Sequence, residues 1–142
     1  DALQQTFDVN FYGALRAAQA FLPLLKKSRA GRIVNVSSTL GSVTALMAPE
    51  APLAPYLVSF ANFAYASSKT ALGWLTAWLA WELKDTPIKV NALCPGYNAT
   101  DMNGNTGTLH PSEGAKLVVR GATFGPDGPT GTFYDANGNL GW

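Results

Sequence analysis

Hydrophobic positions recur at steps of three and four residues through the first part of the chain. They are Leu3, Phe7, Phe11, Ala14, Leu15, Ala18, Leu22 and Leu25. This period predicts an amphipathic helix over residues 3–28, in which Pro23 should kink or tighten the last turn. Ala30 and Gly31 end the helix, and the β-branched run over residues 32–38 predicts a strand of the kind buried in parallel sheets.

A second helix, predicted over residues 62–84, is apolar on two faces. One stripe holds Leu72, Leu75, Leu79 and Leu83, and nearly opposite lie Trp74, Trp78 and Trp81. We expect the leucine stripe to pack on a sheet. The tryptophan stripe needs another partner, either a second subunit or the apolar, proline-containing segment 39–61 folded over it.

A second buried strand is predicted over residues 88–94, and Pro95 and Gly96 end it. A glycine-rich loop follows to Leu109, then a helix that starts at Pro111 and a short strand over residues 131–135. Helices that alternate with strands predict an α/β fold with a parallel sheet. The first of only three strands would leave an apolar edge unpaired, which indicates a truncated sheet.

Composition narrows the class of protein further. With 142 residues there is room for one domain, and the 13% of charged residues and net charge of +1 argue against nucleic acid or an anionic membrane as main partner. Cys94 and His110 are the only cysteine and histidine, so we expect no disulfide within the chain and no metal site. The chain opens at Asp1 inside a helical pattern, and we therefore expect it to be a piece of a longer protein.

The strongest chemical signal is Tyr65-Ala-Ser-Ser-Lys69. Four residues make about one helical turn, so the phenol and the ammonium share a face. A nearby positive charge favours phenolate, and we expect Lys69 to lower the pKa of Tyr65. Ser37 and Ser38 end one strand and residues 91–100 end the next, which should gather these groups at the carboxyl edge of the sheet.

Asn10, Val-Ser-Ser ending at Ser38, Tyr65-x-x-x-Lys69 and Pro95-Gly96-x-x-x-Thr100 together resemble the short-chain dehydrogenase/reductase family over essentially the whole chain. The resemblance implies a Rossmann-like, doubly wound parallel sheet, truncated to its last three strands and helices. Residues 1–142 would be the carboxyl-terminal catalytic part of one domain. The implied activity is hydride transfer between NAD(P)H and a ketone or aldehyde, in a cytoplasmic enzyme.

The resemblance also implies roles for the catalytic residues. Tyr65 would be the general acid or base, and Lys69 would lower its pKa and hold the nicotinamide ribose. Ser38, rather than Ser37, would polarise the substrate oxygen. Asn10 would anchor a water that links Lys69 to solvent.

The remaining predicted contacts are with the cofactor and the substrate. The cofactor residues would be Tyr65, Lys69, Pro95, Gly96, Asn98 and Thr100. The family that the sequence resembles usually carries an aliphatic residue at the position of Asn98. The substrate pocket would be lined by Leu40, Tyr97, Met102 and Trp142, which favours a small hydrophobic carbonyl or alcohol.

Two departures from the family pattern change these expectations. The glycine-rich phosphate loop of the family has no counterpart in this sequence. Residues 125–129 contain two glycines, but their prolines cannot donate to a phosphate. We therefore expect the isolated chain to be inactive.

The separation of Ser38 from Tyr65 exceeds the common spacing and resembles the carbonyl-reductase branch, which favours NADP over NAD and a monomer over a helix-paired homodimer. The insertion could cap the tryptophans through Leu46, Met47, Leu53, Tyr56, Leu57 and Phe60.

Two other functions remain open. An epimerase or dehydratase of the same superfamily shares Tyr-x-x-x-Lys, although the short tail after Pro111 argues against it. A nucleotide-sensing or scaffold protein could keep the fold without the reaction, although Ser38, Tyr65 and Lys69 are all retained. The bare strand edge should leave the isolated chain prone to aggregate, or paired with another copy or with its missing half.

Overall fold

The computed structural model describes residues 1–48 and 60–142. Helix α1 (Ala2–Phe7), the π-helical turn η1 (Asp8–Tyr12) and α2 (Gly13–Leu25) follow one another with helical backbone angles at their junctions. The helix predicted over 3–28 is thus confirmed, but it ends at Leu25. Beyond Pro23 the amides of Lys27 and Ser28 bond to carbonyls three residues back, which is the tightened last turn expected there.

The sheet has four strands in the order β1 (Arg32–Val36), β2 (Lys89–Leu93), β3 (Phe133–Asp135) and β4 (Gly138–Leu140). The β1–β2 and β2–β3 pairs are parallel, as predicted, and Val36 stands opposite Leu93 at the end of the first pair. Strand β4 is antiparallel to β3 and corrects the expected three-stranded sheet. Asp135 closes this hairpin, because its carboxylate accepts the amides of Asn137 at 2.7 Å and Gly138 at 3.2 Å.

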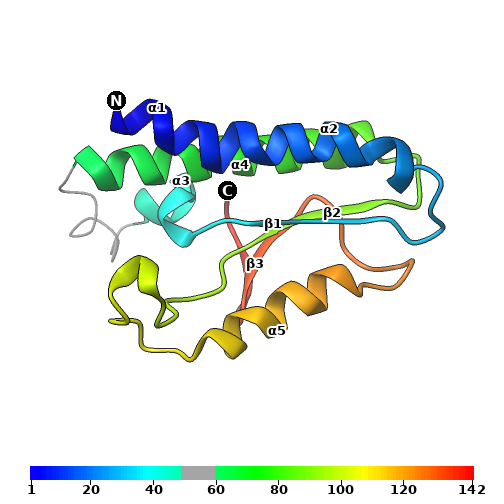
Figure 1. Cartoon of the computed structure of the whole chain (residues 1–142). Coiled ribbons are helices and arrows are strands. Elements are labelled where there is room, and N and C mark those ends of the chain that lie inside the picture. The colour runs from blue at the N-terminus through cyan, green and yellow to red at the C-terminus, as the bar shows by residue number, and fades with distance from the viewer. Residues whose placement is uncertain (49–59) are drawn as a thin grey trace.

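Helices cover both faces of the sheet. Helices α1, α2 and α4 (Phe60–Glu82) lie on one face, and α5 (Pro111–Ala122) lies on the other (Figure 1). The leucine stripe of α4 forms the main core against Ile88 and Val90, as expected. Its members Leu72, Leu75, Leu79 and Leu83 are all buried. No helix in the described ranges combines the length and apolar character needed to cross a membrane.

The tryptophan stripe of α4 lies outside this core. Trp74, Trp78 and Trp81 are 72%, 42% and 63% exposed. Leu53, Tyr56 and Leu57, three of the residues expected to cap the stripe, fall outside the described ranges. The choice between a capping segment and a second subunit therefore stays a prediction.

Short elements follow β1 and lead toward the site. They are η2 (Thr39–Gly41) and α3 (Val43–Leu46), and the carboxyl-terminal residue is tied to the second of them. The backbone amide and hydroxyl of Thr44 donate to the Trp142 carbonyl at 2.9 and 2.8 Å. The Trp142 ring stacks on Phe133, with centroids 5.6 Å apart. These contacts fix the end of the chain beside α3.

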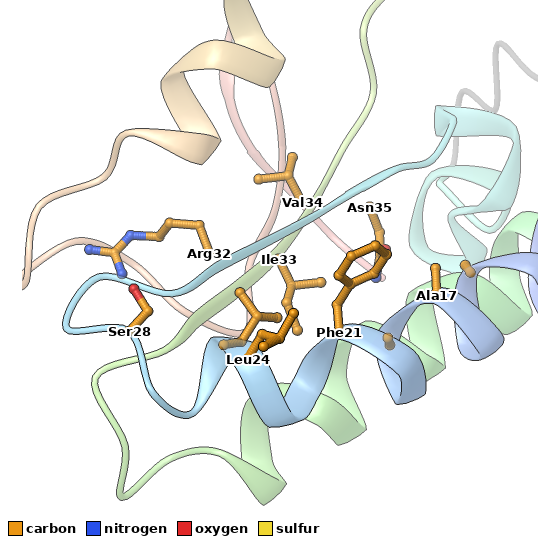
Figure 2. A pocket seen from close by; sticks show the side chains of 11 residues that line it. Ala17, Phe21, Leu24, Ser28, Arg32, Ile33, Val34 and Asn35 are labelled. Carbon is orange, nitrogen blue, oxygen red and sulfur yellow. The ribbon is translucent and has the colours of Figure 1, made fainter.

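Strand β1 forms one edge of the sheet. In the described ranges it pairs only with β2, which confirms the unpaired edge expected from the sequence. A groove of about 440 Å³ runs between β1 and α2, where Phe21 and Leu24 extend toward Ile33 (Figure 2). Phe21 and Leu24 are 60% and 62% exposed, so this edge is also apolar.

Candidate functional site

The carboxyl ends of β1 and β2 lie side by side and place two loops together. The Ser37 amide donates to the Leu93 carbonyl at 2.7 Å, so the β1–β2 pairing continues to the point where Ser38 begins η2. On the neighbouring strand Cys94, Pro95 and Gly96 leave the sheet at the same level. Ser37 is therefore positioned by the end of the parallel ladder, and Ser38 by the first turn of η2.

A pocket of about 460 Å³ lies at this edge. Its lining consists of Ser37, Ser38, Leu40, Asn62, Tyr65, Cys94, Pro95, Gly96, Tyr97, Asn98, Thr100, Met102 and Asn103. Most residues predicted for the site are thus brought together. Three predicted residues do not line this pocket, namely Asn10, Lys69 and Trp142.

Ser38 and Tyr65 meet at the wall of the pocket. Their side chains are hydrogen-bonded to each other, although 26 positions lie between them in the chain. Ser38 is also the N-cap of η2, where its Oγ accepts the Leu40 amide at 3.2 Å. The backbone of η2 therefore holds the Ser38 hydroxyl, and the first turns of α4 hold the phenol that faces it.

The electrostatic environment of the phenol differs from the sequence prediction. The pKa of Tyr65 is raised from its ordinary value, chiefly because burial disfavours phenolate. The hydrogen bond with Ser38 acts in the opposite direction, and the charge of Cys94 adds to the increase. The pKa of Tyr65 is therefore raised overall and not lowered as the sequence predicts, and the phenol is the favoured form at neutral pH.

Lys69 lies one turn after Tyr65, and its ammonium is near both the Tyr65 ring and the end of β1. Its Nζ lies 5.6 Å from the centroid of the Tyr65 ring and donates to the Val36 carbonyl at 2.9 Å. Burial lowers the pKa of Lys69, and the charge of Cys94 opposes that shift. Lys69 and Trp142 line a second pocket of about 370 Å³, together with Phe133 and Trp74.

Asn10 lies in the π-helical turn η1 and contacts α4 rather than the pocket. Its Nδ2 donates to Ser68 Oγ at 3.0 Å, and the fully buried Ser68 donates to the Tyr65 carbonyl at 2.7 Å. Single π-helical turns often mark functional sites. Asn10 is thus linked through Ser68 to the backbone of Tyr65, and not directly to Lys69.

The loop after β2 has a constrained backbone. Gly96 has φ of +82°, a conformation that residues with a Cβ rarely adopt, and an added Cβ would lie 2.7 Å from Leu109 Cδ1. The loop returns to the sheet side through Leu109, whose amide donates to the Tyr97 carbonyl at 3.0 Å. Tyr97 and Met102 are exposed beside it.

The sequence reasoning missed three lining residues, Asn62, Cys94 and Asn103. Cys94 accepts the Thr39 hydroxyl through Sγ at 3.1 Å, a contact across 55 positions that no local pattern indicates. Asn103 could have been found, because Thr100 and Asn103 have the spacing of a capping box and form one around η4 (Asp101–Asn103). Trp142, expected in the substrate pocket, instead packs against Gly73 and Phe133.

Comparison with known proteins agrees with this arrangement. A family model described as enoyl-(acyl carrier protein) reductase matches residues 1–124. Salutaridine reductase of Papaver bracteatum is 34% identical and the (+)-neomenthol dehydrogenase of Capsicum annuum 30% identical, over 94% and 92% of this chain. The NADPH-bound carbonyl reductase from chicken fatty liver superimposes with a TM-score of 0.79 at 26% identity, over 99% of this chain and 57% of that one.

The chain spans about half the length of the curated relatives it matches. The matched region is 52% of salutaridine reductase and 50% of (+)-neomenthol dehydrogenase. Both relatives are named as enzymes that oxidise or reduce their substrates.

Proposed function

Because the chain belongs to the short-chain dehydrogenase/reductase family, we propose that it is the part of an NAD(P)-dependent oxidoreductase that carries the acid–base chemistry. The reaction is the interconversion of a carbonyl compound and an alcohol. The observation that carries the proposal is the hydrogen bond between Ser38 and Tyr65 at the wall of an edge pocket. Two hydroxyls that converge from separate elements define one point at which an oxygen of the substrate can accept from both.

The residues present fit the nicotinamide end of a dinucleotide. Lys69 Nζ has three donors and uses one for Val36, so others are available for ribose hydroxyls. The Pro95–Thr100 segment offers main-chain groups along the same pocket. Neither connection from a strand to a helix in the described ranges carries a glycine-rich phosphate loop. We propose that residues 1–142 are the carboxyl-terminal catalytic part, and that the phosphates are bound outside them.

When bound, the reduced nicotinamide supplies the hydride for the carbonyl carbon. Tyr65 donates its phenolic proton to the carbonyl oxygen, which becomes the alcohol hydroxyl and leaves phenolate at Tyr65. The raised pKa of Tyr65 suits this direction, because the phenol holds its proton at neutral pH until the oxygen becomes basic. Ser38 donates to the same oxygen and stabilises the charge that develops there.

Two residues act on Tyr65 after the transfer. The Lys69 ammonium, near the face of the ring, stabilises the phenolate. Asn10, through Ser68, holds the backbone of Tyr65 in place. We propose that a water near Asn10 returns the proton from solvent by way of Lys69.

The residues Leu40, Tyr97 and Met102, which line the pocket, support a small hydrophobic carbonyl compound as substrate. We propose NADP rather than NAD, on the likeness to the NADPH-bound carbonyl reductase.

The test uses the full-length enzyme with NADPH and a panel of aromatic and aliphatic carbonyl compounds. Tyr65→Phe removes only the hydroxyl, and turnover should fall by about 10² to 10⁴ while NADPH affinity stays close to that of the wild type. Tyr12→Phe is the matched control, because Tyr12 is exposed on η1 outside the pocket. Turnover that survives in Tyr65→Phe would refute the proposed role.

A further inference from the structure

The turn that follows β2 is held by two asparagine side chains. Asn98 Nδ2 donates to the carbonyls of Pro95 at 2.9 Å and Gly96 at 3.0 Å. Asn103 Nδ2 donates to the Asn98 carbonyl at 2.7 Å, while Asn103 Oδ1 accepts the Thr100 amide at 3.1 Å. Side-chain amides thus contact main-chain groups at four of the six positions from 95 to 100.

Asn103 is itself fixed from both sides. Its backbone amide donates to the Thr100 carbonyl at 3.1 Å, and its backbone carbonyl accepts the Thr106 hydroxyl at 2.7 Å. The Thr106 hydroxyl is also 2.6 Å from the Tyr97 phenol oxygen. Asn103 therefore acts as a bridge between a firmly held turn and the pocket-lining main chain of residues 98–100.

The two partners of the Asn103 side chain differ in kind, since the Asn98 carbonyl is an acceptor and the Thr100 amide is a donor. Only a group with both an N–H and a carbonyl oxygen at this length satisfies both. A carboxylate would satisfy Thr100 but set negative charge against the Asn98 carbonyl, and an aliphatic residue would satisfy neither. The hydrogen-bond pattern therefore requires an amide at position 103.

Asn98 is not optimised for the stability of the loop. Its Oδ1 is buried and has no hydrogen-bond partner among the described residues, and the amide packs where Gly114 leaves room. An added Cβ at Gly114 would lie 2.7 Å from Asn98 Nδ2. An unpaired buried acceptor is unfavourable, and in Asn98 it accompanies two hydrogen bonds that Nδ2 donates to the turn.

We propose that Asn103 is a positioning residue that holds the main chain of Asn98 and Thr100 in the conformation that receives the carboxamide of the nicotinamide. This inference rests on the proposed function of the same pocket. Asn103 acts only through residues 98–100 and does not touch the reacting atoms. Its loss should weaken binding of the nicotinamide end of the cofactor and leave the adenosine end unaffected.

The test measures affinity by fluorescence titration of the full-length enzyme, with NADPH and with 2′,5′-ADP, which lacks the nicotinamide. Asn103→Leu loses both side-chain hydrogen bonds of Asn103. It should raise the dissociation constant for NADPH about tenfold, the effect of one lost hydrogen bond between the main chain and the carboxamide, and leave that for 2′,5′-ADP unchanged. Asn139→Leu is the matched control, because Asn139 is an exposed asparagine on β4.

A second variant tests the requirement for a donor. Asn103→Asp should bind NADPH poorly at neutral pH and recover part of its affinity as the pH falls, because a protonated carboxyl can again donate to the Asn98 carbonyl. Asn103→Leu should show no such recovery.

Three outcomes would overturn the inference. One is wild-type affinity for NADPH in Asn103→Leu. Another is an equal loss for NADPH and 2′,5′-ADP, which would mean general damage to the fold. The third is a wild-type enzyme that binds no NADPH, which would overturn both this inference and the proposed function. The first outcome, in an active wild-type enzyme, would overturn the inference alone.

Discussion

Replacing Ser38 by alanine removes two interactions that the structure gives to one hydroxyl. Ser38 Oγ caps η2 by accepting the Leu40 amide at 3.2 Å, and the same side chain is hydrogen-bonded to Tyr65. Ser37 precedes it and offers a matched control. Its hydroxyl is buried, and its contact among the described residues is a long one, 3.4 Å, with the Lys69 carbonyl.

The size of each effect follows from these contacts. Loss of the cap should cost Ser38→Ala about 1 kcal/mol of unfolding free energy. Loss of a donor to the substrate oxygen should lower turnover by about 10² to 10³. Ser37→Ala loses a weak bond away from that oxygen, so its turnover should stay within about threefold of the wild type.

The pKa of Tyr65 provides a third readout. The hydrogen bond with Ser38 lowers this pKa while burial raises it, so Ser38→Ala should move phenolate formation to higher pH. Urea denaturation, steady-state kinetics and alkaline absorbance titration on both variants together measure the three effects. Equal losses of turnover in Ser37→Ala and Ser38→Ala would refute the assignment, as would a Tyr65 pKa that falls in Ser38→Ala.

Two more predictions concern Tyr65 and α4. Burial raises the pKa of Tyr65, so the folded state favours the phenol, and above about pH 10 the wild type should lose stability more steeply than Tyr65→Phe. Denaturation midpoints measured against pH check this, and parallel curves would contradict it. Leu79→Ala, at a buried position on α4, should cost about 2 to 5 kcal/mol in chemical denaturation, whereas Trp74→Ala on the exposed stripe should cost less than about 1 kcal/mol. The reverse order would mean that the tryptophans, not the leucines, face the core.

Periodic patterns predicted the main elements well. The leucine stripe of α4 and the β-branched run before Ser37 gave a helix and a strand where the structure has them, because burial against one sheet fixes both periods. Strand β4 was missed because its three residues carry no periodic signal. It forms through Asp135 and pairing with β3, which are tertiary and turn interactions.

Motifs predicted most of the pocket lining, but not its energetics. The resemblance brought Ser38, Tyr65 and Pro95 to one edge, and the structure places them there. The shift of the Tyr65 pKa was predicted in the wrong direction, because spacing reports a neighbouring charge and not the depth of burial. Trp142 stacks on Phe133 and does not line this pocket, and an aromatic residue near the end of a chain does not reveal from sequence which surface it packs on.

The unpaired edge of β1 affects how firmly Ser38 is held. In a parallel ladder alternate amides of β1 point away from β2, so they should exchange with solvent deuterium through small local openings. The amides of β2 lie between two strands and should exchange only when the sheet opens. Ser38 lies two residues after the end of β1, the less protected of the two strands. Any strand that adds to this edge would suppress those openings, and pairing at the edge would thereby be coupled to the geometry of the Ser38–Tyr65 pair.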